Sequence, residues 1–430
     1  MKRIKFFVYS PFLLTALLWL LSKGSISDIS NNVLRSIVQL SAMVGATAIV
    51  IEPILSSRSR ILEMFIGSQD KLYREHRTLG VIATTSIVIH LGTLLLRSVS
   101  IIIDPYQYLI PGTNLSYTAG ILAFYALIIM IVTTIYIRLS YRSWKIVHKI
   151  TSVMIALSAL HIFTVSSDIS ESLLLRSWFI LLFMFALISW IYKLFIYERS
   201  AFKYRYKVTE MIKKENIVQI KMTPLSKPLK IRPGQFAFFK FLSKDPNITA
   251  ESHPFSILRS TNDELHIAVK SLGDFTEQLE RLSTDDIALV TEPHGEFSKR
   301  YFDQTDEAVW IAGGIGVTPF MSMLEHIHTN GERRQTYIFH TVKKQEEDLF
   351  DKQIHEMTSG MSKIHFTKHV TSELGYLQPK SVVDHLSKPL ETDYFLCGPR
   401  SLLDTFYQYL IDIGVESDRI IFEEFDFKTL

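Results

Sequence analysis

The sequence predicts an α-helical bundle of six transmembrane helices, followed by an antiparallel β-barrel domain and an α/β domain with a parallel sheet. Three observations support this fold class. Six apolar stretches lie within the first 196 residues, and most approach the ~20 residues that a helix needs to cross a bilayer. Residues 203–300 contain short strand-like segments, in which apolar and polar residues alternate, separated by turn signals, as in a small barrel. From about residue 305, strand-like and helix-like segments alternate, as in a parallel sheet.

Charge separates the chain into two unlike parts. The chain is 47% hydrophobic and 21% charged, which excludes a disordered chain and argues against a wholly soluble enzyme. Residues 1–196 carry 17 Lys and Arg against 8 Asp and Glu, and residues 197–430 carry 29 against 35. Because the basic charge flanks apolar stretches, it indicates membrane topology and argues against a nucleic-acid partner. We expect three domains: a membrane domain over 1–196, a barrel over 197–303 and an α/β domain over 304–430.

The connecting segments predict how the chain crosses the membrane. The six apolar stretches are residues 6–21, 33–55, 79–97, 117–137, 147–165 and 173–196. We interpret the first as a span rather than a cleaved signal peptide, because no small-residue cleavage site follows it. Lys and Arg concentrate before the first span, between the second and third, and between the fourth and fifth. By the positive-inside rule, we expect both termini and residues 197–430 in the cytoplasm of a protein integral to the cell membrane.

Four histidines mark two levels of the membrane. His76 and His90 are 14 residues apart on the third span, and His148 and His161 are 13 apart on the fifth. At ~1.5 Å per residue, roughly 20 Å separates the two histidines of each span. His76 then shares the inner level with His148, and His90 shares the outer level with His161. Two facing imidazoles can complete the axial coordination of a haem iron. Packing histidines are the alternative, which we disfavour because polar side chains inside membranes are rare and usually functional.

The histidine spacing on the fifth span sets a geometric condition. Thirteen residues advance an ideal helix by about 1300°, which is not a whole number of turns. We therefore expect this span to be tilted or locally distorted, or to present two faces.

The third span resembles that of a known family. The stretch Asp70-Lys71-Leu72-Tyr73-Arg74-Glu75-His76-Arg77, followed by an apolar run to His90, is similar to the third span of NADPH oxidases and ferric reductases. The histidine spacings match that family's two bis-histidine b-type haems. The resemblance, which covers about residues 30–427, implies that His76 and His148 hold one haem b and that His90 and His161 hold the other.

The barrel region carries a pattern that resembles the FAD-binding signature of ferredoxin reductase-like modules. The pattern is His253-Pro254-Phe255-Ser256, continued by Ile257 and preceded by Pro233-Gly234-Gln235-Phe236. The resemblance implies that the backbone and the hydroxyl near Ser256 bond the flavin ring. Lys270 and the amides around Gly273-Asp274-Phe275-Thr276 would then hold the pyrophosphate. For each piece alone, a turn beside a strand end is the ordinary alternative.

Two motifs in the α/β region resemble the nicotinamide-nucleotide site of the same superfamily. Gly313-Gly314-Ile315-Gly316-Val317-Thr318-Pro319-Phe320 follows a strand-like segment, and its glycines let the backbone approach phosphates at a helix start. It is neither the GxGxxG fingerprint nor a GxxxxGK[ST] phosphate loop. Its counterpart is Leu396-Cys397-Gly398-Pro399, where the resemblance implies a cysteine near the nicotinamide. A buried small hydrophobe is the alternative for Cys397, the single cysteine of the chain.

Other positions have predicted roles with open alternatives. Lys343 and Lys344 follow the second α/β strand and favour the 2′-phosphate of NADPH, with NADH as the alternative. The resemblance implies that a C-terminal aromatic side chain covers the flavin, with Phe427 as the first candidate and Phe425 as the second. Arg35, near the outer end of the second span, is either a snorkelling interfacial arginine or a partner for an outer haem propionate or a bound anionic product.

These patterns together predict an oxidoreductase that carries electrons across a membrane. NAD(P)H would reduce FAD, and electrons would pass through the inner and outer haems to an acceptor on the far side. Molecular oxygen, giving superoxide, ranks first as acceptor and a ferric chelate second. A periplasmic or quinone-type partner ranks third, and no feature of the sequence requires a protein partner. A transporter with proton-relaying histidines is a different class of protein, which the flavin and nucleotide motifs argue against.

Overall fold

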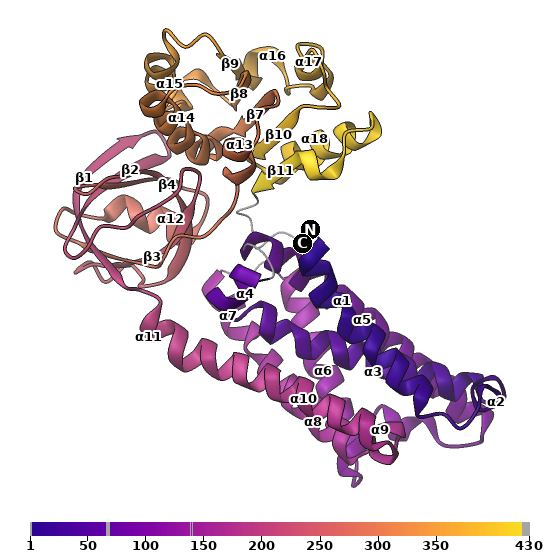
Figure 1. Ribbon diagram of the computed structural model, residues 1–430. Coiled ribbons are helices and arrows are strands. Elements are labelled where there is room, and N and C mark those ends of the chain that lie inside the picture. Colours follow the sequence, from indigo (N-terminus) through magenta and orange to yellow (C-terminus); the bar gives the residue numbers. More distant parts are fainter. Residues whose placement is uncertain (1, 66–68, 138, 140, 424–430) are drawn as a thin grey trace. The chain divides into compact units, whose positions relative to one another are not determined.

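The computed structural model describes residues 2–65, 69–137, 139 and 141–423. The chain divides into two compact units, Met1–Glu198 and Arg199–Thr429, which we call unit 1 and unit 2. In Figure 1, unit 1 is coloured from indigo to magenta, and unit 2 continues to yellow at the C-terminal end.

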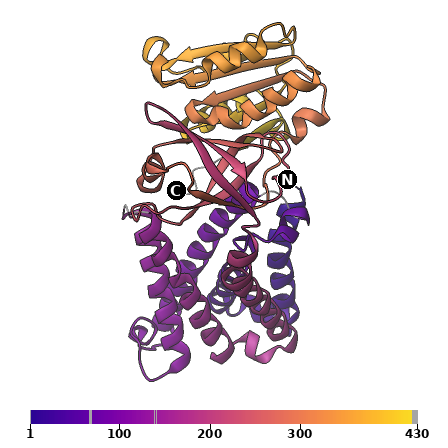
Figure 2. The same cartoon turned by 90° about the vertical axis from the view of Figure 1, so that its left-hand side faces the viewer.

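Unit 1 is a bundle of long apolar helices, which lie side by side in Figure 2. Among the described residues, six helical segments are long and apolar enough to cross a membrane, which confirms the predicted bundle. The spans are formed by α1 (Lys2–Leu21), α3 (Val33–Leu55), α5 (Gln69–Ser100), α6 (Leu115–Ile135), α7 (Tyr141–His148) with α8 (Ile150–Thr164), and α10 (Leu173–Ile191) with a π-helix (Tyr192–Tyr197). Short helices connect them: α2 (Ile26–Ser30), α4 (Arg60–Phe65), a 3₁₀ turn (Pro105–Tyr108) and α9 (Asp168–Glu171), and α11 (Glu198–Ser200) follows the last span.

Two spans differ from the apolar stretches that predicted them. Helix α5 begins at Gln69, ahead of the apolar stretch that starts at residue 79, because its charged first turns still form helix. The fifth span is interrupted between α7 and α8. There the Lys149 N–H donates to the Ile146 carbonyl (3.1 Å) and the Ser152 N–H donates to the Lys149 carbonyl (3.0 Å). Such i→i−3 bonds advance the chain by about 120° per residue instead of about 100°. The fifth span is therefore locally distorted between its two histidines, which is one of the three arrangements expected from their spacing.

The first half of unit 2 is a closed barrel of antiparallel strands in the order β1-β2-β5-β4-β3-β6. Alternate residues of its strands, such as Tyr206, Ile220, Phe239 and Ile267, fill the interior. The strands are β1 (Tyr204–Lys214), β2 (Ile217–Pro224), β3 (Phe236–Leu242), β4 (Ser252–Ser260), β5 (Leu265–Lys270) and β6 (Ile287–Val290), and α12 (Asp274–Gln278) follows β5.

The second half of unit 2 is a five-stranded parallel sheet in the order β11-β10-β7-β8-β9. Alternate residues of β7 face opposite layers: Trp310 packs with the α14 side and Ile311 with the α18 side. Burial on both faces explains the continuous apolar run of this strand. The strands are β7 (Ala308–Gly313), β8 (Thr336–Val342), β9 (Ile364–Val370), β10 (Asp393–Cys397) and β11 (Ile420–Glu423); the helices are α13 (Lys299–Asp303), α14 (Thr318–Asn330), α15 (Asp351–Thr358), α16 (Thr371–Leu374), α17 (Pro379–Val383) and α18 (Arg400–Asp412).

A buried carboxylate joins three arginines at the amino end of this sheet. Asp393, at the start of β10, is fully buried and pairs with Arg334 (3.1 Å), Arg300 (2.9 Å) and Arg419 (3.3 Å). Arg334 is also buried and donates to the carbonyls of Tyr301 (3.2 Å) and Glu307 (3.1 Å). Removing one partner of a buried ion pair leaves the remaining charge buried without a counter-ion, so we expect Asp393 to contribute strongly to the stability of unit 2.

Replacing Asp393 with alanine is expected to lower the free energy of unfolding of unit 2 by about 3–5 kcal/mol, because it leaves the Arg334 charge buried without its counter-ion. Denaturant unfolding of the purified full chain in detergent measures the loss. The matched control is Glu356→Gln, which breaks the exposed Lys352–Glu356 pair (3.7 Å) and should cost below about 1 kcal/mol. Equal losses in the two variants would contradict this role of Asp393.

Candidate functional site

The two nucleotide motifs of unit 2 meet at the carboxyl edge of the parallel sheet. Strands β7 and β10 are neighbours with Ala312 opposite Cys397, so the loops that follow them lie together. A Cβ atom on Gly316 would lie 2.4 Å from the Cys397 carbonyl oxygen, and one on Gly398 would lie 2.9 Å from the Gly313 backbone. Backbones this close admit only glycine. The carboxyl edge is also where ligands bind to open α/β sheets.

The glycine-rich loop leads directly into helix α14. Gly314 has a φ of 55°, which favours glycine, and a 3₁₀ turn over Gly314–Val317 precedes Thr318 and Pro319 in the first turn of the helix. The start of a helix presents free backbone N–H groups that suit a phosphate. The Ser322 hydroxyl of α14 accepts a hydrogen bond from the Gly234 N–H (2.6 Å), which ties this helix to the turn that precedes β3.

A buried histidine that the sequence analysis missed supports the same loop. His340, in the interior of β8, places Nε2 3.0 Å from the Gly314 carbonyl and Nδ1 3.4 Å from the Asp348 carboxylate. Burial raises the pKa of Asp348, but the nearby His340, the hydrogen bond from the Phe350 N–H (3.0 Å) and Lys368 together outweigh it and lower that pKa to about 2. An ionised Asp348 therefore anchors the side chain that holds Gly314. The signal in the sequence was one polar residue in the apolar run Tyr337-Ile338-Phe339-His340.

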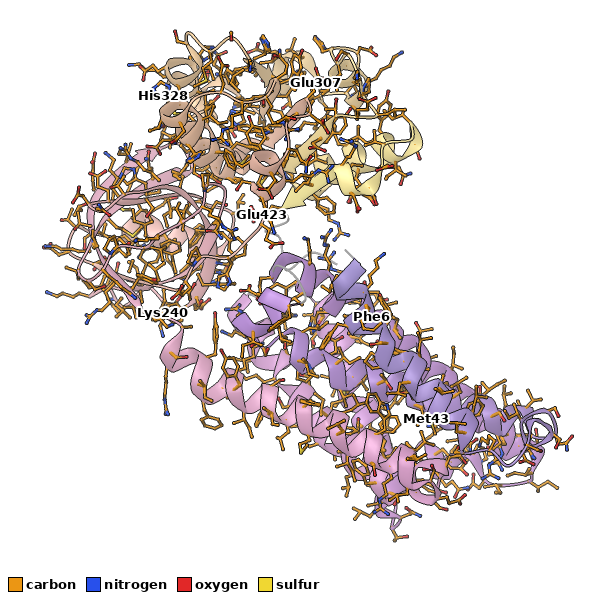
Figure 3. The ribbon with its side chains drawn as sticks, viewed as in Figure 1. Phe6, Met43, Lys240, Glu307, His328 and Glu423 are labelled. Carbon is orange, nitrogen blue, oxygen red and sulfur yellow. The ribbon has the colours of Figure 1, made fainter. Side chains whose placement is uncertain are left out.

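Cys397 is buried at the end of β10 within the apolar layer under α14. Burial raises the pKa of its thiol, and the nearby Glu423 carboxylate raises it further. Glu423 pairs with Cys397 in the β10–β11 register, and Figure 3 labels it at the end of β11. The thiol is therefore neutral, a small apolar group at the sheet edge rather than a nucleophile. Lys343 and Lys344 lie exposed after β8, at this same edge.

The structure places the predicted flavin residues on β4 and around α12. The imidazole of His253 stacks on Phe275 with ring centroids 3.9 Å apart. Ser256 is buried opposite Phe236 of β3, and Ile257 lies in the barrel core. The residues brought together are those of the motif His253-Pro254-Phe255-Ser256-Ile257 with Gly273-Asp274-Phe275-Thr276.

Other predicted residues have different surroundings. The Lys270 ammonium pairs with Glu347 (3.2 Å) from the loop after β8. The Thr276 hydroxyl accepts hydrogen bonds from the Leu272 (2.9 Å) and Gly273 (3.1 Å) N–H groups, which shapes the turn before α12. Arg35 is exposed near the start of α3. Phe427 and its alternative Phe425 lie outside the described residues.

In unit 1, the structure brings the rings of His76 and His148 close together. Their ring centroids are 6.2 Å apart with planes at 65°. A metal–imidazole bond of about 2.0 Å, added to a ring radius of about 1.1 Å on each side, gives a centroid separation of about 6.2 Å for two axial ligands. His76 Nδ1 lies against the Glu52 carboxylate, and the His148 ring stacks on Trp144 at 4.9 Å. The observed separation of the two rings equals the one expected for two imidazoles bound to one iron.

The second histidine pair has its Nδ1 atoms held by the backbone. His90 Nδ1 lies 2.9 Å from the Val38 carbonyl, and His161 Nδ1 lies 2.8 Å from the Ser116 carbonyl. Donation from Nδ1 leaves Nε2 free with its lone pair, the usual state of a metal-binding histidine. A Cβ on Gly120 would lie 2.8 Å from His161 Nδ1, so glycine is needed beside this ring. In the described part of the chain no cluster of three or more His, Cys, Asp or Glu side chains could hold a metal ion, whereas a porphyrin needs only two axial imidazoles.

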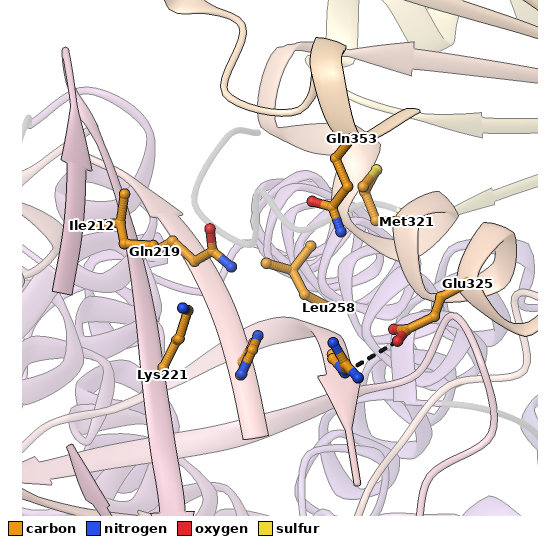
Figure 4. Close-up of a pocket in the computed structure, with 9 residues that line it drawn as sticks. Ile212, Gln219, Lys221, Leu258, Met321, Glu325 and Gln353 are labelled. Carbon is orange, nitrogen blue, oxygen red and sulfur yellow. Dashed lines mark ion pairs between the residues drawn. The ribbon is translucent and has the colours of Figure 1, made fainter. Parts of the chain in front are cut away.

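One cavity lies away from these residues, between the outer face of the barrel and helices α14 and α15 (Figure 4). It has a volume of about 240 Å³, and Arg259 and Glu325 form an ion pair of 3.1 Å across its edge. The lining residues are Ile212, Gln219, Lys221, Leu258, Arg259, His266, Met321, Glu325 and Gln353. None of the predicted cofactor residues is among them.

Comparison with family models divides the chain in the same way. Residues 38–159 match the ferric reductase like transmembrane component, residues 202–318 an FAD-binding domain and residues 310–407 an oxidoreductase NAD-binding domain.

Relatives of known sequence match about half of the chain. A flavohemoprotein of Candida norvegensis is 26% identical over 224 residues, covering 50% of this chain and 56% of its own length. The reductase component of propane 2-monooxygenase from Mycolicibacterium goodii is 24% identical over 231 residues, covering 50% of this chain and 64% of its own length. This chain thus spans between half and two thirds of each relative.

A solved structure shares the fold. The flavohemoglobin of Malassezia yamatoensis aligns with a TM-score of 0.53 at 18% identity, covering 92% of this chain and 97% of its own. Similarity at this level shows the fold alone. The three family models nonetheless follow one another along a single chain whose first part is a multi-pass membrane bundle. The chain therefore joins a ferric reductase like transmembrane component to an FAD-binding domain and an oxidoreductase NAD-binding domain, which is a ferric reductase-like architecture.

Proposed function

We propose that this protein carries electrons from cytoplasmic NAD(P)H, through FAD and two b-type haems, to an acceptor on the outer face of the cell membrane. The observation that carries the proposal is the separation of 6.2 Å between the rings of His76 and His148, which matches two axial ligands of one iron. His90 and His161 support a second site, because each ring has its Nδ1 engaged by a carbonyl.

Each part of the chain then has a defined task. The chemistry supplied by bound FAD is the conversion of a hydride into single electrons, and that supplied by bound haem is their relay. Gly313, Gly316 and Gly398 let the two loops at the sheet edge pack closely against each other, and the neutral Cys397 thiol gives that edge an apolar surface. Lys343 and Lys344, exposed after β8, are suited to the 2′-phosphate of NADPH.

We infer the order of the two haem sites from the point at which the chain leaves unit 1. Lys193, on the π-helix after α10, lies near both His76 and His148, and the chain enters unit 2 soon afterwards. Electrons from unit 2 therefore reach this first pair before the second. The basic segments flanking the spans at this end agree with a cytoplasmic position for both termini.

The proposed acceptor is molecular oxygen, with two superoxide ions formed for each NADPH oxidised to NADP⁺ and one proton released. The segments that connect the spans at the end of the bundle with His90 and His161 are short and carry few charges, which favours a small diffusible acceptor. A ferric chelate is the alternative of the same kind, and a periplasmic or quinone-type partner is the third.

The acceptor is tested by supplying NADPH to the purified protein with oxygen or ferric citrate in separate reactions. In the oxygen reaction, we expect a signal from a superoxide reporter, and we expect superoxide dismutase to abolish that signal. NADPH oxidation that depends on ferric citrate, without a dismutase-sensitive signal in oxygen, would instead identify a ferric-chelate reductase.

A further inference from the structure

Helix α3 supplies the Nδ1 partner of both histidines on α5. Glu52 faces His76, and the Val38 carbonyl faces His90. The two partners are 14 residues apart on α3, as the two histidines are on α5, so the antiparallel helices match at both levels. The partners differ in charge, since one is a carboxylate and the other a neutral backbone carbonyl.

The position of Glu52 needs an explanation, because a carboxylate inside a membrane span is costly and usually functional. Its Oε2 atom and His76 Nδ1 are both buried and face each other. Its Oε1 atom lies 3.7 Å from the place where Gly80 would carry a Cβ, one helical turn after His76. Both carboxylate oxygens thus lie along α5, on the side that carries His76 and a glycine.

A carboxylate on the outer nitrogen of a metal-bound histidine raises the basicity of the ligand and fixes its orientation. A more basic axial ligand favours the oxidised iron and lowers the reduction potential of the haem. A backbone carbonyl bears no net charge and has a smaller effect. The negative charge of Glu52 would therefore affect a haem held by His76 and His148, and would have little effect on one held by His90 and His161.

We propose that Glu52 is a positioning residue that makes the haem of the first pair the stronger reductant of the two. This inference rests on the proposed function, since it requires a haem at each histidine pair. Electrons that arrive from unit 2 then move downhill from the first haem to the second. Glu52 touches His76 and not the reacting atoms, so it acts through the ligand.

The test compares the reduction potentials of both haems in the wild-type protein and in Glu52→Gln, measured by potentiometric reduction in detergent with visible spectra. Glutamine keeps the shape of the side chain and removes the charge. We expect one haem component to become easier to reduce by about tenfold in its equilibrium constant, or ~59 mV for a one-electron couple, while the other stays unchanged.

The chain offers a matched control. Glu75 is adjacent to His76 in the sequence, but its carboxylate accepts a hydrogen bond from the Tyr9 hydroxyl (3.0 Å), so its side chain joins α5 to α1. Glu75→Gln should leave both potentials unchanged. The inference is overturned if Glu52→Gln retains both haems with wild-type potentials, or if Glu75→Gln shifts the same component equally.

A variant that keeps the charge covers the case in which Glu52→Gln loses haem. Glu52→Asp is expected to bind both haems, with the reduction equilibrium of the first within about threefold of wild type. Loss of haem from Glu52→Asp as well would assign Glu52 a packing role and overturn the inference. A wild-type protein without haem would instead contradict the proposed function, so the two failures can be told apart.

Discussion

Replacing Gly316 with alanine is expected to slow flavin reduction by NADPH at least about 10²-fold. The added Cβ would lie 2.4 Å from the Cys397 carbonyl oxygen and 2.6 Å from its carbon, and both are backbone atoms that cannot rotate away. The glycine-rich loop must therefore move away from the strand end. A displacement of about 1 Å in a bound substrate lowers the reaction rate about 10²-fold. Stopped-flow absorbance of the flavin under anaerobic conditions measures the rate.

Two controls separate this effect from general damage. Dithionite should reduce the haems of Gly316→Ala as it does those of the wild type, because it bypasses the nucleotide site. Gly112→Ala places a Cβ where no atom lies within 4 Å, and it should retain the wild-type rate. A Gly316→Ala protein that NADPH reduces at the normal rate would show that the two loops do not form the nucleotide site.

Replacing His161 with leucine is expected to remove one of two haems and to stop electron delivery to oxygen. The remaining haem, held by His76 and His148, should still be reduced by NADPH. The reason is geometric: the His161 ring lies against Gly120 with Nδ1 fixed by the Ser116 carbonyl, and leucine has no atom that can ligate iron. Haem content per chain and dismutase-sensitive superoxide formation are the two measurements.

Thr164→Ala is the matched control on the same helix. Thr164 is exposed, and its hydroxyl donates a hydrogen bond to the Leu160 carbonyl of its own helix, so its replacement should leave both haems and the activity unchanged. If His161→Leu kept two haems per chain, the assignment of His161 as a ligand would be wrong.

The fold was predictable because its signals are local. Apolar length predicted six spans, and alternation predicted a barrel followed by a parallel sheet, all confirmed by the structure and the family models. Span limits were less accurate where charged residues such as Lys71 and Arg74 extend α5 beyond its apolar part. The spacing of His148 and His161 predicted a span that is tilted, locally distorted or two-faced, and the structure has a break between α7 and α8.

The partners of the site residues could not be predicted, because they depend on how distant elements pack. Glu52 meets His76 only through the register of α3 against α5, which no periodicity in the sequence encodes. His340 supports Gly314 across two neighbouring strands, and Lys270 pairs with Glu347, 77 residues further along the chain. The roles assigned to the four membrane histidines and to the cofactor motifs stay predictions.

The most direct test is to add NADPH, without oxygen, to the full chain purified in detergent, while recording its absorption spectrum. We predict the Soret and α bands of b-type haem, at two haems per chain, shifting to the reduced form with no other protein present. A spectrum without haem, or a flavin that becomes reduced while the haem bands stay oxidised, would contradict an electron path from the nucleotide through four membrane histidines.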